Sequence, residues 1–96
     1  MKRRNTQLLR EVLLQVLREN RLDTKLAEKH LIEAWPLVLG KSVEQYTRSR
    51  EIKNNILYVS ISSAVLRHDL FLSREEIKNA LNAHVGSEVI KDIIFR

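Results

Sequence analysis

Residues 47–62 read TRSREIKNNILYVSIS, and they change from a polar to an alternating pattern. Residues 47–53 form a polar segment, and residues 56–62 alternate apolar and polar side chains, as a half-buried strand does. The Asn54-Asn55 pair lies between the two segments. Because Asn tolerates positive φ, a two-residue type I′ turn fits there. The stretch therefore predicts a β-hairpin that buries Leu57, Val59 and Ile61.

A helical pattern follows the hairpin and begins at Ser62 or Ser63, whose side chain can cap the first turn. Its apolar stripe extends to Val85, which favours one long helix. Ser73-Arg74-Glu75-Glu76 also fits a capping box, so two helices are the alternative. Gly86 suits a left-handed helix C-cap, and Val89 to Phe95 reads as a last strand.

Two amphipathic segments precede the hairpin. The first, Thr6 to Asn20, carries a wide apolar stripe, so this helix can have two neighbours, one of them in another chain. The second begins at Asp23 or Thr24, and Pro36 predicts a kink or a helix restart because proline cannot continue the backbone bonding. Trp35 lies on the apolar stripe of this second segment and is expected to anchor the core.

The predicted order is α, α (kinked), β, β, α, β. It indicates an α+β fold, in which helices pack on one face of a three-stranded sheet. The pairing of the last strand stays open. A chain of 96 residues has room for a single domain, here divided into an N-terminal basic arm and amphipathic helix (1–22) and a core (23–96).

The charge of the chain is unevenly distributed. The net charge of +5 lies wholly in residues 1–50, which hold 11 Lys and Arg against 6 Asp and Glu. A basic half attracts the phosphates of nucleic acid or of a membrane surface, although the same charge can serve solubility alone. Neither a secretion signal nor a membrane-spanning stretch is visible, and cysteine is absent, so a soluble protein of the cytoplasm is expected.

The residues that catalysis requires are scarce. His30, His68 and His84 are far apart and lack metal-ligand spacing. With only Gly40 and Gly86, the chain cannot build a glycine-rich phosphate loop. We therefore expect no enzymatic activity, no cofactor, no metal and no small-molecule substrate.

Basic side chains form the candidate nucleic-acid contacts. One group lies in the N-terminal arm and first helix, and another alternates along the hairpin, where Tyr58 can stack with a base. Such arginines and lysines also serve as solvated termini and as protection of sheet edges, so the alternative is structural. Arg67, Arg74 and Lys78 lie among glutamates and are interpreted as a solvated mixed face. The expected nucleic-acid contacts are Lys2, Arg3, Arg4, Arg10, Arg48, Arg50, Lys53 and Tyr58.

Several short motifs in a fixed order resemble the DciA-like family, a bacterial domain long of unknown function. They span residues 24–96: Ala34-Trp35-Pro36, Val38-Leu39-Gly40, Leu57-Tyr58-Val59, Ser62-Ser63, Leu70, Leu81-Asn82, Gly86 and Ile93-Ile94-Phe95. The resemblance implies a K-homology-like fold and a role in chromosome replication. DciA-like proteins bind DNA and the ring-shaped replicative helicase, and assist helicase placement without hydrolysing nucleotide.

The chain departs from that pattern in two ways. The Gly-x-x-Gly loop with which K-homology domains grip nucleic acid is missing between Ser63 and Val85. The flexible basic tail of longer family members has no counterpart after Phe95, so contacts made by that tail are not carried over. We expect a replication accessory module whose partners are the replicative helicase and single-stranded or duplex DNA, with RNA as an open alternative. A second hypothesis is a protein adaptor without nucleic-acid binding, which uses Leu8 and Leu14.

Overall fold

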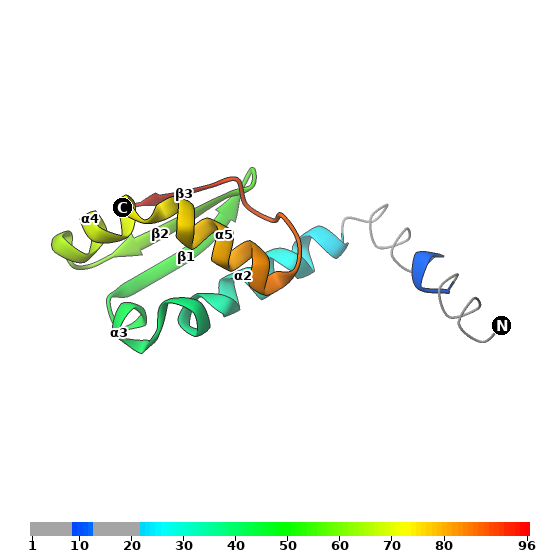
Figure 1. Cartoon of the computed structure of the whole chain (residues 1–96), viewed down its shortest axis with the longest axis horizontal. Helices are drawn as coiled ribbons and strands as arrows, with labels where there is room; N and C mark the ends of the chain where they lie inside the picture. Colours follow the sequence, from blue (N-terminus) through cyan, green and yellow to red (C-terminus); the bar gives the residue numbers. More distant parts are fainter. Residues whose placement is uncertain (1–8, 13–21) are drawn as a thin grey trace.

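The computed structural model describes residues 9–12 and 22–96 of the chain (Figure 1). In chain order the elements of the second range are α2 (Leu22–Leu39), α3 (Lys41–Glu44), β1 (Thr47–Lys53), β2 (Ile56–Ile61), α4 (Ala64–Leu72), α5 (Arg74–Val85) and β3 (Asp92–Phe95). The fold is α+β with a three-stranded mixed sheet, as predicted. The K-homology-like part of the expectation stays a prediction.

The predicted hairpin is confirmed. β1 and β2 pair antiparallel, and Asn54 and Asn55 join them with φ of 52° and 64°. Both values lie in the left-handed region that a type I′ turn requires. β2 is the central strand, because it also pairs with β3, in parallel.

The core lies on the face of the sheet toward which the helices pack. Leu57, Val59 and Ile61 of β2 alternate with half-buried neighbours, which is the burial pattern expected for a sheet covered on one side. Figure 1 shows α2 and α5 side by side over the sheet, and they form the largest helix–helix contact. From the helices and the segment before β3, the core receives Leu31, Ala34, Trp35, Leu70, Ile77, Leu81, Val89 and Ile90.

The single long helix favoured by the periodicity is wrong. Ser73 interrupts it with φ of −102° and ψ of 13°, so that α4 and α5 are separate helices. The two helices pack on different elements: α4 packs on β2 and β3, whereas α5 packs mainly on α2. The side chain of Ser73 makes no capping bond, so the proposed capping box is not formed. Ser63 does cap α4, because its Oγ accepts a hydrogen bond from the Leu66 amide.

The helix restart predicted at Pro36 occurs instead at Gly40. α2 continues through Pro36 to Leu39, and the chain breaks at Gly40, whose φ of 91° suits glycine. Pro36 lacks an amide hydrogen, but its carbonyl still accepts a bond from the Gly40 amide at 2.9 Å. Gly86, with φ of 90°, forms the expected left-handed cap of α5.

The last strand is shorter than predicted. β3 begins at Asp92, whereas Val89 and Ile90 are buried outside any strand. Asn82 of α5 holds this segment, since its Oδ1 accepts from the amides of Val89 and Ile90 and its Nδ2 donates to the Ile90 carbonyl. The side-chain bonds of Asn82 therefore replace strand pairing here.

Candidate nucleic-acid interface

The two hairpin arginines of the predicted site lie beside an irregularity in β1. The strand register shifts between Thr47 and Ser49, which interrupts the alternation of side chains at Arg48. Arg48 is exposed. Arg50 lies opposite the core residue Val59 and is half-buried, and its Nη1 is enclosed without a hydrogen-bond partner. A strict alternation of side chains along the strand predicts that Arg48 and Arg50 lie on one face. The bulge interrupts this alternation, so the prediction does not hold.

Lys53 and Tyr58 lie on the opposite, outer face of the sheet. The register pairs Glu51 with Tyr58 and Lys53 with Ile56, so all of these side chains are on this face. The guanidinium of Arg96 lies 5.0 Å from the centre of the Tyr58 ring and donates a hydrogen bond to Glu51 Oε1 at 2.7 Å. Lys53 Nζ lies 3.8 Å from the same oxygen. We call Glu51, Lys53, Tyr58 and Arg96 the outer-face cluster.

Sequence reasoning missed Arg96 and the role of Glu51. Arg96 reaches Tyr58 only because β3 runs parallel to β2, a pairing that the alternation of apolar residues does not determine. Glu51 opposes both cations of the cluster. Their charge is therefore partly neutralised before any phosphate approaches, although exposed ion pairs of this kind are worth only about 0 to 1 kcal/mol each.

The predicted contacts do not form one patch. Arg50 is on the helix-covered side of the hairpin, and Lys53 and Tyr58 are on the outer side. Arg10 is exposed within the helical residues 9–12. Lys2, Arg3, Arg4, Leu8 and Leu14 lie outside the described residues.

The third basic group is divided in the structure. Lys78 Nζ contacts Glu75 Oε1 at 2.6 Å, so the charges are mixed, but the Lys78 side chain is only 17% exposed. The guanidinium of Arg74 instead lies 4.2 Å from the centre of the Phe71 ring. Arg67 lines a hollow together with Phe71. Sequence reasoning had little ground to single out Phe71, because it lies within the apolar region of a helix.

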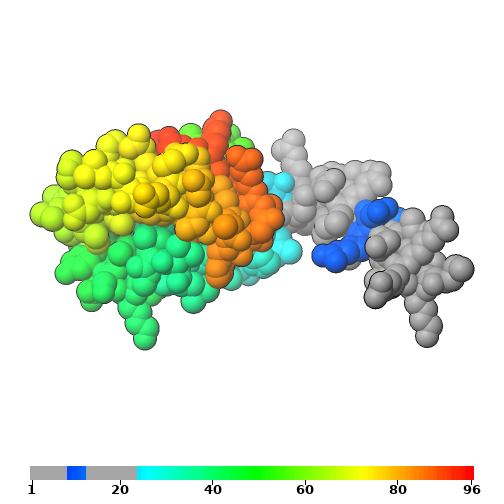
Figure 2. Space-filling model, viewed as in Figure 1, coloured from blue at the N-terminus to red at the C-terminus, as the bar shows by residue number. Residues whose placement is uncertain are grey.

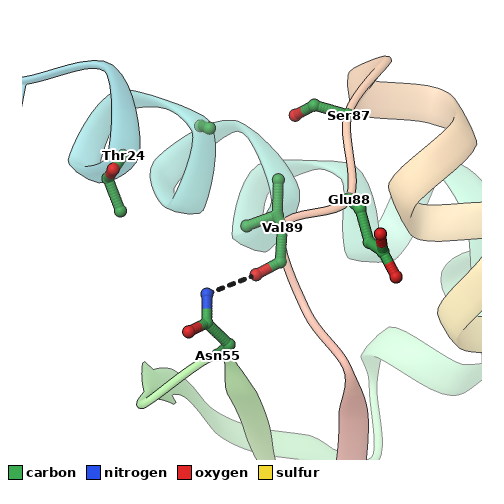
Figure 3. Close-up of a pocket in the computed structure, with 6 residues that line it drawn as sticks. Thr24, Asn55, Ser87, Glu88 and Val89 are labelled. Atoms are coloured by element: carbon green, nitrogen blue, oxygen red, sulfur yellow. Dashed lines mark hydrogen bonds between the residues drawn. The ribbon is translucent and has the colours of Figure 1, made fainter. Parts of the chain in front are cut away.

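A hollow of about 250 Å³ lies where the hairpin turn meets the segment before β3 (Figure 3). In Figure 3 the Asn55 amide donates to the Val89 carbonyl, at 3.0 Å. The Lys91 amide donates to the Asn55 carbonyl at 2.8 Å. Thr24, Ser87 and Glu88 complete the polar lining. This lining holds one carboxylate and no histidine, cysteine or lysine. The hydrogen bonds of Asn55 tie the turn to the segment before β3.

Two of the histidines, one on α2 and one on α5, line the same hollow. His30, Glu33 and His84 line another hollow of about 250 Å³. Within residues 9–12 and 22–96, however, no group of three His, Cys, Asp or Glu side chains could hold a metal ion. In the same ranges, no helix combines the length and apolar character needed to cross a membrane.

The arrangement thus presents two separate surfaces of a small α+β fold, and each of them combines cationic with aromatic side chains. No curated protein matches the sequence. The model of the family described as "Dna[CI] antecedent, DciA" matches residues 8–95, which is nearly the whole chain. This family is associated with loading of the replicative helicase. The match confirms the resemblance carried by the short motifs, and the chain belongs to the DciA family.

Proposed function

We propose that this protein is a non-enzymatic accessory module of DNA replication. It binds nucleic acid without strong sequence preference and contacts the replicative helicase, which it helps to load or operate in the cytoplasm. The domain holds DNA and a helicase surface together by charge and shape. All nucleotide chemistry belongs to the partner.

The observation that carries the proposal is the family match over residues 8–95, because the family is associated with helicase loading. The charge supports the nucleic-acid part, since a net charge of +5 attracts phosphate. We infer that the basic segment 1–22 acts as an arm and that 23–96 is the core, in a K-homology-like arrangement. The phosphate contacts of the proposal are those predicted from the sequence, and Arg96 joins them beside Tyr58.

Salt dependence of binding tests the nucleic-acid part. Each neutralised phosphate releases counterions, so five contacts give a log–log salt slope of about −3.5 on single strands and about −4.5 on duplex. The measurement is fluorescence anisotropy of labelled single-stranded and duplex DNA across a salt series. A flat response, or no binding at low salt, contradicts nucleic-acid binding.

A matched pair of variants then locates the contacts. Arg48→Gln/Lys53→Gln removes two exposed hairpin charges, and Lys29→Gln/Lys41→Gln removes two exposed charges from α2 and α3. We expect the hairpin variant to lower the affinity more than the control and to flatten the slope. Equal losses in both variants would show that only net charge matters.

A protein adaptor without nucleic-acid binding is the second candidate. The observation that favours it is the exposure of Leu9 (73%) and Val12 (59%) in the helical residues 9–12. Apolar side chains this exposed on one helix are suited to a partner helix or a second copy.

Substitution of the leucines tests the adaptor candidate. Leu8→Ser/Leu14→Ser should abolish capture of the purified replicative helicase, or self-association in sedimentation, while thermal unfolding stays unchanged. Arg10→Gln, on the same helix, serves as a control for charge. Retained capture and unchanged self-association would exclude Leu8 and Leu14 as partner contacts.

A further inference from the structure

A third hollow, of about 270 Å³, lies between α4 and the end of β3. Ala64, Arg67, His68 and Phe71 line it from one stripe of α4, and Phe95 lines it from β3. Phe95 pairs in register with the core residue Val59, so the hollow is on the helix-covered side of the sheet, away from the outer-face cluster. Figure 1 shows the end of the chain beside α4, and Figure 2 shows α4 at the surface, in yellow-green.

Arg67 supplies an unsatisfied donor at this hollow. Its Nε is enclosed and has no hydrogen-bond partner. A guanidinium carries five N–H donors and binds phosphate oxygens with a planar fork, and a buried donor without a partner is unfavourable. Because this Nε is itself enclosed, an anionic oxygen in the hollow would be stabilised by the positive charge of Arg67 and not by a bond to Nε.

Arg74 adds a second cation beside the hollow. Its guanidinium lies 4.2 Å from the centre of the Phe71 ring, and its Nη1 donates to the Phe71 carbonyl at 3.1 Å. These contacts fix the position of the charge. Among the described residues, neither Arg67 nor Arg74 forms an ion pair with a carboxylate, and no carboxylate lines the hollow.

Phe71 gives the hollow an aromatic surface. Its side chain is 47% exposed, although it lies on a helix whose Leu70 is buried in the core. Nucleic-acid bases stack on aromatic rings and on guanidinium planes. A volume of about 270 Å³ is just below the range of roughly 300 to 1,000 Å³ typical of small-molecule sites, so it suits a group of the size of one base.

The outer-face cluster is less suited to the same ligand. In both places a guanidinium lies near the ring, 5.0 Å from the Tyr58 centre and 4.2 Å from the Phe71 centre. On the outer face, however, Glu51 opposes the charges of both Arg96 and Lys53. The hollow beside α4 combines unopposed cations with an exposed ring. The charge and the shape favour a single strand over a duplex, which keeps its bases stacked inside the helix.

We propose that this hollow is the single-strand binding site of the domain. One unstacked base enters it and contacts Phe71, and the adjacent phosphates bind Arg67 and Arg74. This inference rests on the proposed function and deepens it, because it assigns single-strand binding to a defined site on α4.

The experiment measures anisotropy with labelled oligothymidine of 15 nucleotides and with a duplex of equal length. Phe71→Leu keeps an apolar side chain but removes the ring, and we expect about a tenfold loss of single-strand affinity with unchanged duplex affinity. Arg67→Gln/Arg74→Gln should flatten the single-strand salt slope by about 1.4. Lys29→Gln/Lys41→Gln is the control for the loss of two charges. Arg74→Gln alone serves if the double variant unfolds.

The outcomes separate the two proposals. If the wild-type protein binds neither the oligothymidine nor the duplex at low salt, both the proposed nucleic-acid function and the proposed site are wrong. If the wild-type protein binds but Phe71→Leu retains full single-strand affinity, this site is wrong while the proposed function survives. Loss of helicase capture with unchanged DNA binding would overturn the inference in favour of a protein interface. Photo-cross-linking of 5-iodouridine oligonucleotide to the α4 peptide would support it directly.

Discussion

The indole Nε1 of Trp35 donates a hydrogen bond to the Thr47 hydroxyl at 3.0 Å, and this hydroxyl donates in turn to the Val43 carbonyl at 2.9 Å. Trp35 is fully buried, so its N–H has no access to water. The ring also lies 6.3 Å from that of Phe95, centre to centre. One threonine at the start of β1 therefore satisfies the polar atom of the largest core residue and connects it to α3.

Removal of this hydroxyl should destabilise the fold. Thr47→Val preserves the shape of the side chain but leaves the buried indole N–H unpaired, which costs about 1 to 3 kcal/mol. The free energy of unfolding in urea measures the loss. Thr47→Ser keeps the hydroxyl and is expected to retain most of the stability. A Thr47→Val protein as stable as the serine variant would show that the bond contributes nothing.

Asn82 should be far more sensitive to substitution than its neighbour on the same helix. Asn82→Ala removes three hydrogen bonds that hold the Val89–Ile90 segment, at 2.9, 3.0 and 3.1 Å. At about 1 kcal/mol for each bond, the expected loss is roughly 3 kcal/mol. Asn79→Ala, at an exposed position of α5, should change the stability by less than about 0.5 kcal/mol. Similar thermal midpoints for the two variants would contradict this role of Asn82.

The hairpin turn should respond differently at its two positions. Both asparagines have positive φ, so glycine relieves backbone strain at either one. Asn-Gly is the preferred type I′ pair, yet Asn55→Gly also removes the amide that donates to the Val89 carbonyl. We expect Asn54→Gly to be the more stable variant, by about 1 kcal/mol, in urea denaturation. The opposite order would mean that turn preference outweighs the bond to Val89.

Glu51 should weaken nucleic-acid binding if the outer face contributes to it. Glu51→Gln removes the carboxylate that opposes Arg96 and Lys53. We expect a severalfold gain in DNA affinity and a steeper salt slope in anisotropy titrations. Glu44→Gln removes an equally negative but remote side chain of α3 and controls for net charge. Equal gains in the two variants would exclude a direct role of the outer face.

The hairpin and the helix ends could be predicted from the sequence because their signals are local. Alternation predicted β2, the polar segment before it predicted β1, Asn54-Asn55 predicted the turn, and Ser63 and Gly86 predicted the caps. The break at Ser73 could not be predicted in the same way. The apolar stripe stays continuous across it, and only the tertiary structure shows that α4 faces the sheet while α5 faces α2.

The site was harder to predict than the fold. Proximity of Phe71 to Phe95, and of Arg96 to Tyr58, depends on the parallel pairing of β3 with β2. When two strands are far apart in sequence, neither strand contains a local pattern that predicts which strand it pairs with. The sequence therefore indicated which residue types were available for binding, whereas the topology determines which of them lie together.

The central position of β2 means that the nascent chain completes its sheet in two steps. Its antiparallel partner β1 precedes it directly, and a hairpin forms within about 1 to 10 μs. Its parallel partner β3 follows only after residues 62–91, whose synthesis takes about 2 to 6 s at about 5 to 20 residues per second. For that interval β2 lacks the cover of α4 and its pairing with β3, so one of its edges is open. The domain is then most exposed to aggregation, which makes the passage from hairpin to closed sheet the step at which a chaperone would act.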